Sequence, residues 1–145
     1  MSRVSGFLAI VFALLCGALP ARGAQDAALE RGTAITDPAA LRELEEETGI
    51  KPRLVEKIAR SPNIHRYRLP DELVGKVWKN SKWIGQAQTW YLARFLGSDA
   101  DVNLETKHPE FRDWQWAAPE RLPELIVPFK RELYREVLDA FADYL

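Results

Sequence analysis

Polar and apolar residues alternate most regularly between residues 85 and 97, in the stretch GQAQTWYLARFLG. Because successive side chains of a strand point to opposite faces, this period of two predicts the best-defined strand of the chain. One face would carry Gln86, Gln88, Trp90 and Leu92, and the other Ala87, Thr89, Tyr91 and Ala93. Further short strands are predicted at residues 53–61, 63–70, 101–105 and 111–117, with a polar loop over 71–83.

Helical signals lie on either side of these strands. Asp37 can cap the free N–H groups of a first turn, Pro38 suits the first helical position, and Gly49 can end the helix in a left-handed conformation. A helix is therefore predicted over residues 38–48. Another is predicted from Pro128 onward, with a buried side formed by Leu133, Tyr134, Val137, Leu138, Phe141 and Leu145. Strands bracketed by helices predict an α/β or α+β sandwich.

The composition is that of one globular domain, with 145 residues of which 47% are hydrophobic and 28% are charged. A net charge of −1 excludes a broad basic surface for nucleic acid or for an anionic membrane. Any phosphate ligand would therefore need a local site. Cys16 is the single cysteine, which excludes a disulfide framework and is typical of a cytosolic protein.

Residues 1–24 do not fit a cytosolic protein. Arg3 is followed by an apolar run over residues 7–19 and then by small residues, which is the layout of a secretory signal peptide. The run is too short for a stable membrane span, and the alternative interpretation is a buried strand or helix. Residues 25–35 show little periodicity and are predicted to be a linker.

Glutamates crowd the stretch RELEEETGI at residues 42–50. On a helix, Glu43, Glu46 and Glu47 would project to one side, and Arg42 could steady Glu46 one turn away. Carboxylates this close repel, and a divalent cation would remove the repulsion. Oxygen ligands favour Mg²⁺ or Mn²⁺, and a chain whose histidines are His65 and His108 is poorly suited to zinc. The alternative is an ordinary solvated helix face.

The same stretch resembles the second half of the Nudix box. It matches every fixed position of that half, through Arg42, Glu43, Leu44, Glu46, Glu47, Gly49 and Ile50. The segments IHRYRLP, WIGQAQTWYLARFLGSDADVNLE, HPEFRDWQW and VPFKRELYREVLDAFA resemble the bacterial RNA pyrophosphohydrolase branch, also described as dinucleoside polyphosphate hydrolases. The resemblance covers residues 36–145, and Arg42 and Gly49 would support the helix of the box.

The resemblance implies a Nudix-type α/β/α sandwich with a mixed sheet and a cytoplasmic enzyme that uses Mg²⁺ or Mn²⁺. This enzyme would cleave pyrophosphate bonds in RNA 5′-triphosphate ends or in dinucleoside polyphosphates. Glu43, Glu46 and Glu47 match the family's catalytic and metal-binding glutamates. Glu110 matches a further acidic residue that reaches the metal from a loop. We expect a monomer that binds a nucleotide or an RNA 5′ end, without a DNA partner or a stable membrane span.

Substrate contacts are also implied. Phe129 and Lys130 match positions beside the bound 5′ nucleotide, where an aromatic ring stacks on the base. Phe129 could instead be a core residue at the start of the last helix. Gln86 and Gln88 could line the phosphate cleft or only pair across strands.

The front of the chain departs from the family pattern. The first half of the box requires a glycine and a glutamate where this chain has Ala28 and Ala34. A slip of reading frame or a wrong start codon would explain a chain that is family-like only from residue 36. We therefore predict that residues 1–35 do not supply the missing N-terminal strands, and that activity is low. Two alternatives to an active hydrolase stay open, namely a catalytically impaired remnant and an exported or membrane-tethered binding domain.

Overall fold

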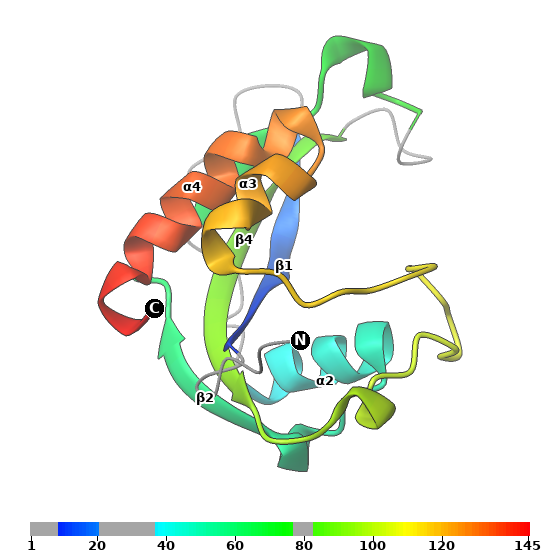
Figure 1. Cartoon of the computed structure of the whole chain (residues 1–145). Helices are drawn as coiled ribbons and strands as arrows, with labels where there is room; N and C mark the ends of the chain where they lie inside the picture. Colours follow the sequence, from blue (N-terminus) through cyan, green and yellow to red (C-terminus); the bar gives the residue numbers. More distant parts are fainter. Residues whose placement is uncertain (1–8, 21–36, 77–82) are drawn as a thin grey trace.

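The computed structural model describes residues 9–20, 37–76 and 83–145. The sheet consists of β1 (Ala9–Pro20), β2 (Val55–Arg60), β3 (His65–Arg68) and β4 (Trp83–Phe95). The α-helices are α2 (Asp37–Thr48), α3 (Leu122–Leu125) and α4 (Arg131–Ala140), and Figure 1 shows their arrangement. The predicted strands at 53–61, 63–70 and 85–97 and both predicted helices are confirmed, but Leu145, predicted on the buried side of the last helix, lies beyond its end and is exposed. Among the described residues, no helix is long and apolar enough to cross a membrane.

Strand β4 is the centre of the sheet. Strand β1 pairs with one edge of β4 in the antiparallel sense, from Ala9 opposite Arg94 to Pro20 opposite Trp83. The antiparallel partners on the other edge are β2, opposite residues 91–95, and β3, opposite residues 85–88. The mixed sheet implied by the resemblance is therefore not found, because every pairing between described strands is antiparallel.

The expectation that residues 1–35 add no strand to the sheet is wrong, because β1 runs along β4. An uncharged apolar run is typical both of a signal segment and of a buried strand, so its pattern alone does not decide between them. An unpaired edge of β4 would leave a row of backbone N–H and C=O groups without partners, and β1 supplies them. The predicted linker at 25–35, together with Ala28 and Ala34, lies outside the described residues.

Helices cover both faces of β4. On one face, Trp90 and Leu92 belong to a core that includes Leu133, Val137 and Phe141. On the other face, Tyr91 packs against Ala39 and Ala40 of α2. Since neighbouring residues of a strand point in opposite directions, α4 and α2 lie on opposite faces of β4. The described part of the chain is thus an α+β structure with helices on both faces of β4, as the sequence pattern predicted.

The predicted strands at 101–105 and 111–117 are wrong. A 3-10 turn spans Asp99–Asp101, and the chain from 102 to 118 has no regular structure. The Asn103 N–H donates to the Thr48 carbonyl at 2.8 Å. This backbone group is therefore bonded to the end of α2 and not to a neighbouring strand. The rings of Trp114 and Trp116, which alternate with polar residues in the sequence, pack edge to face with centroids 5.3 Å apart, without any strand pairing in this segment. Figure 1 shows this segment running past α2 before it reaches α3.

Candidate active site

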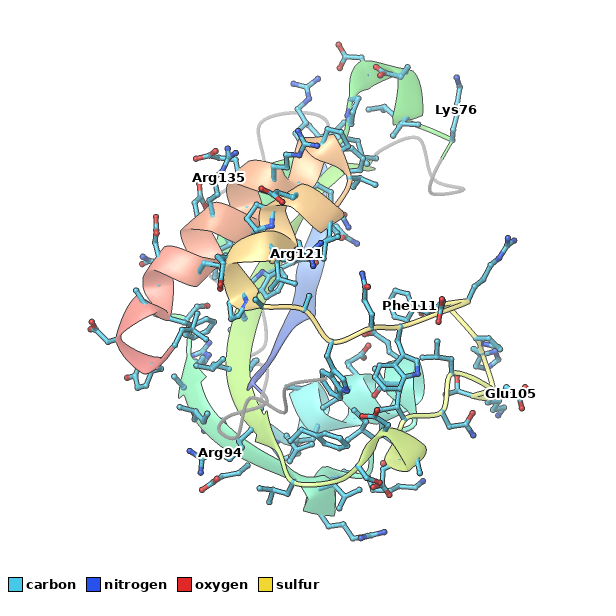
Figure 2. The ribbon with its side chains drawn as sticks, in the orientation of Figure 1. Lys76, Arg94, Glu105, Phe111, Arg121 and Arg135 are labelled. Atoms are coloured by element: carbon cyan, nitrogen blue, oxygen red, sulfur yellow. The ribbon has the colours of Figure 1, made fainter. Side chains whose placement is uncertain are left out.

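The acidic residues of α2 meet a residue from the irregular segment. The pKa of Glu47 is raised from 4.5 to about 7, first by burial and then by the negative charges of Glu110, Glu43 and Glu46. The structure therefore brings Glu43, Glu46 and Glu110 within electrostatic reach of Glu47, although Glu110 is 63 residues from Glu47 in the sequence. Figure 2 shows Phe111, which follows Glu110, on the segment that passes α2.

The other glutamate of the stretch, Glu45, lies outside this acidic cluster. Its Oε1 is 2.6 Å from Lys51 Nζ, so its charge is paired beyond the end of the helix. Arg42 lies near Glu46, with 3.9 Å between Arg42 Nε and Glu46 Oε1, and both side chains are exposed. We call Glu43, Glu46, Glu47 and Glu110 the acidic cluster.

Gly49 fixes the end of the helix that carries the cluster. Its φ is +72°, and its N–H donates to the Glu45 carbonyl at 2.8 Å. A Cβ at this position would lie 2.5 Å from the backbone oxygen of Asn103. Only glycine suits both the left-handed conformation and the close approach of that backbone. The sequence prediction that Gly49 ends this helix is confirmed.

The acidic cluster suits a metal ion in its chemistry but does not form a closed metal site. Within the described ranges, no group of three or more His, Cys, Asp or Glu side chains is close enough to hold an ion. Carboxylate oxygens are the ligands that Mg²⁺ and Mn²⁺ prefer. Burial raises the pKa of Glu47 first, and the negative charges of Glu110, Glu43 and Glu46 raise it further. A divalent cation would offset these charges.

The predicted substrate residues gather around one ring that the sequence did not single out. The ring of Tyr67 lies 5.8 Å from that of Phe129, and Lys130 Nζ lies 4.7 Å from its centroid. The Tyr67 hydroxyl donates to Gln86 Oε1. Gln88 Nε2 also donates to that oxygen, at 3.4 Å. The structure thus places Gln86, Gln88, Phe129 and Lys130 in one aromatic and amide group.

Phe129 and the two glutamines each have two predicted roles, one in packing and one in contact with the substrate. Phe129 is partly buried and packs against the core, as the core interpretation requires. Gln88 is buried and bonded to Gln86, whereas Gln86 is only partly buried. Burial lowers the pKa of Lys130, which shows that its ammonium group is partly removed from water. A partly buried cation of this kind suits a phosphate ligand.

Tyr134 connects the acidic cluster to the group around Tyr67. The pKa of Tyr134 is raised by burial and then by the Glu47 charge. The pKa of Tyr67 is raised to about 12 by burial and then by Tyr134. The sequence pattern assigned Tyr134 only to the core. Its position one helical turn after Lys130 could have marked it as a residue of the site.

Comparison with known proteins matches residues 30–137 to the NUDIX domain. The chain is 54% identical to an RNA pyrophosphohydrolase of Dinoroseobacter shibae over 107 residues, which are 74% of this chain and 66% of that protein. It is 54% identical to the RNA pyrophosphohydrolase of Novosphingobium aromaticivorans over 109 residues, 74% of this chain and 67% of that protein. The chain thus spans about two thirds of the length of these relatives. It belongs to the NUDIX domain family.

Proposed function

We propose that this chain hydrolyses pyrophosphate bonds in nucleotides and removes pyrophosphate from the 5′-triphosphate end of RNA. The name of its relatives, RNA pyrophosphohydrolase, supports the choice of substrate. The observation that carries the proposal is Glu47, a half-buried carboxylate with a pKa of about 7 among three other carboxylates. The RNA substrate also favours the cytoplasmic location that the resemblance implies.

Glu47 is the proposed general base. A base works best when its pKa lies near the working pH, because it is then often ionised and still binds a proton strongly. A pKa of about 7 meets that condition. In this role Glu47 takes the proton of the attacking water. Tyr134, whose pKa is raised in part by the Glu47 charge, would lie on the side of Glu47 that faces the proposed nucleotide site.

Glu43, Glu46 and Glu110 are proposed to hold Mg²⁺ or Mn²⁺ beside Glu47, which is left to act as the base. When bound, the cation would neutralise and polarise the phosphate oxygens. Arg42 keeps Glu46 near the cluster, and Gly49 fixes the end of the helix. The chain places Glu43, Glu46 and Glu47 on a helix whose end is bonded to Asn103, and Glu110 reaches them from the irregular segment.

The nucleotide is proposed to bind at the start of α4. The Phe129 ring would stack on the base, and the partly buried Lys130 would face a phosphate. Gln86 would donate an amide N–H to a phosphate oxygen, because its carbonyl oxygen already accepts from Tyr67 and Gln88. Dinucleoside polyphosphates offer the same base and phosphates, and they are the alternative substrate.

A second candidate is a NUDIX domain that binds nucleotides but hydrolyses them slowly. Two observations favour it, namely the absence of a closed metal site within the described residues and the alanines at positions 28 and 34. Slow hydrolysis would then rise with Mg²⁺ concentration without reaching a plateau. An active enzyme should instead saturate with the ion.

The deciding experiment compares wild type with two matched glutamine variants on triphosphorylated RNA and on diadenosine polyphosphate, with Mg²⁺ present. Glu47→Gln removes the proposed base, and Glu45→Gln removes a neighbouring carboxylate that is paired with Lys51. We expect hydrolysis by the wild type and by Glu45→Gln, and a loss of about 100-fold or more in Glu47→Gln. Equal activity in the two variants would contradict the assignment of Glu47. Binding of both substrates with cleavage of neither would favour the second candidate.

A further inference from the structure

Three buried polar atoms between the sheet and α4 lack hydrogen-bond partners. They are His65 Nε2, Gln88 Oε1 and Trp90 Nε1, and none has a partner among the described residues. Their side chains are 7%, 6% and 3% exposed, respectively. Buried polar groups of folded proteins are nearly always bonded, so these three require an explanation.

The three side chains lie on the same face of the sheet. His65 of β3 is directly opposite Gln88 of β4, and Trp90 follows Gln88 by two residues. Directly paired residues, and residues two apart on one strand, point to one side of a sheet. Helix α4 covers this side, because Tyr134 packs edge to face on Trp90 with 5.2 Å between ring centroids.

The partner of His65 fixes which ring nitrogen carries the proton. His65 Nδ1 lies 3.4 Å from Glu136 Oε2. A carboxylate only accepts hydrogen bonds, so Nδ1 must be the donor. In the neutral ring, Nε2 is then an acceptor. Together with the carbonyl oxygen of Gln88 and the indole N–H of Trp90, the cluster presents two acceptors and one donor.

One water molecule matches this set. Its oxygen can accept from Trp90 Nε1, and its two hydrogens can go to His65 Nε2 and Gln88 Oε1. Buried waters in proteins make about three hydrogen bonds of this kind. The network would then continue toward the substrate site, since Gln88 Nε2 donates to Gln86 Oε1.

We propose that His65 is a positioning residue for Gln86 and Gln88, and that it acts through one buried water shared with Gln88 and Trp90. The water fixes the carbonyl oxygen of Gln88, and so directs its amide N–H groups to Gln86. Gln86 is held from two sides, because the Tyr67 hydroxyl donates to the same oxygen. The amide N–H groups of Gln86 are left to face a phosphate. This last step rests on the proposed function.

The first test is independent of catalysis. At a pH where the His65 ring is neutral, its ¹⁵N shifts in the substrate-free protein should place the proton on Nδ1. The Trp90 indole N–H should show a cross-peak to slowly exchanging water. A proton on Nε2 in the neutral ring, or an indole N–H without a nearby water, would overturn the proposal.

The second test separates positioning from packing. His65→Leu keeps an apolar filler but removes both nitrogens, and His65→Gln keeps a polar group that can reach the water. We expect KM for triphosphorylated RNA to rise about fivefold in His65→Leu, with kcat within about twofold, and to recover in His65→Gln. Equal KM in the two variants would overturn the positioning role. If neither the wild type nor any variant cleaves RNA, the proposed function fails. The position of the proton on the His65 ring still decides whether the proposed water site exists.

Discussion

The rings of Phe129 and Tyr67 lie 5.8 Å apart between centroids, and their planes are tilted by 40°. This contact joins the turn before α4 to β3, and Lys130 lies against the same tyrosine. A base that stacks on Phe129 must therefore use the part of the ring that Tyr67 leaves free. The contact makes Phe129 both a packing residue and a candidate ligand contact, and substitution can separate these roles.

Phe129→Ala is expected to weaken nucleotide binding by more than its loss of folding stability would account for. Base stacking on an aromatic ring contributes about 1–3 kcal/mol, which corresponds to a roughly 5- to 150-fold increase in Kd. Titration calorimetry with a nonhydrolysable nucleotide measures this change. Phe129→Leu is the control, because it retains apolar contacts without a flat ring. Unchanged affinity in a less stable Phe129→Ala protein would assign the ring to the core.

Gly49→Ala should destabilise the fold and reduce activity. The substitution forces a side chain into φ +72° and places its Cβ 2.5 Å from the Asn103 oxygen. A loss of about 1–3 kcal/mol in unfolding free energy is expected, measured by urea denaturation. Gly75→Ala, at φ +78° and outside the site, is the control for backbone strain alone. An active Gly49→Ala enzyme would show that the end of α2 does not position the cluster.

The stability of the metal-free protein should fall as pH rises from about 4.5 to about 7. The folded pKa of Glu47 is raised above its ordinary value, so the folded state holds this proton more tightly than the unfolded state. The stabilising contribution of protonated Glu47 to the free energy of unfolding is present below pH 4.5 and is lost as pH passes 7. Allowing for solvent screening at a partly exposed group, we expect on the order of 1–2 kcal/mol.

Thermal or urea unfolding over this range measures the effect as a difference between two proteins. Glu47→Gln cannot titrate at that position and should lack this part of the slope, whereas Glu45→Gln should retain it. Identical pH profiles in the wild type and in Glu47→Gln would mean that Glu47 is not the group responsible.

Mg²⁺ should stabilise the wild-type chain at pH 8 and should do so through the acidic cluster. Ions that bind only the folded state raise its stability, and Mg²⁺ at about tenfold over its Kd should raise Tm by roughly 3–6 °C. The shift should shrink in Glu47→Gln and Glu110→Gln and persist in Glu45→Gln. A shift of equal size in all four proteins would point to a different ion site.

Local sequence patterns predicted the strand and the helix that carry the site, but not the side chains that pack around it. The period of two located β4, and the caps at Asp37 and Gly49 located α2, because both signals act within a few residues. Tyr67 was not singled out and Tyr134 was assigned only to the core, since their roles at the site depend on strand register and on the packing of α4 over the sheet. The alternation of Trp114 and Trp116 with polar residues was misread as a strand, because a period of two does not by itself provide a neighbouring strand to pair with.

The place of β4 in the chain has a consequence for how the molecule forms. Every described strand pairing involves β4, and β4 follows β1, β2 and β3 in the sequence. A nascent chain therefore cannot close any of these ladders until residues 83–95 have left the ribosome. Until then the apolar segment of β1, more than 60 residues ahead, has no described strand to pair with. Synthesis of this chain should thus pass through a long interval in which the apolar segment of β1 is unpaired and open to aggregation.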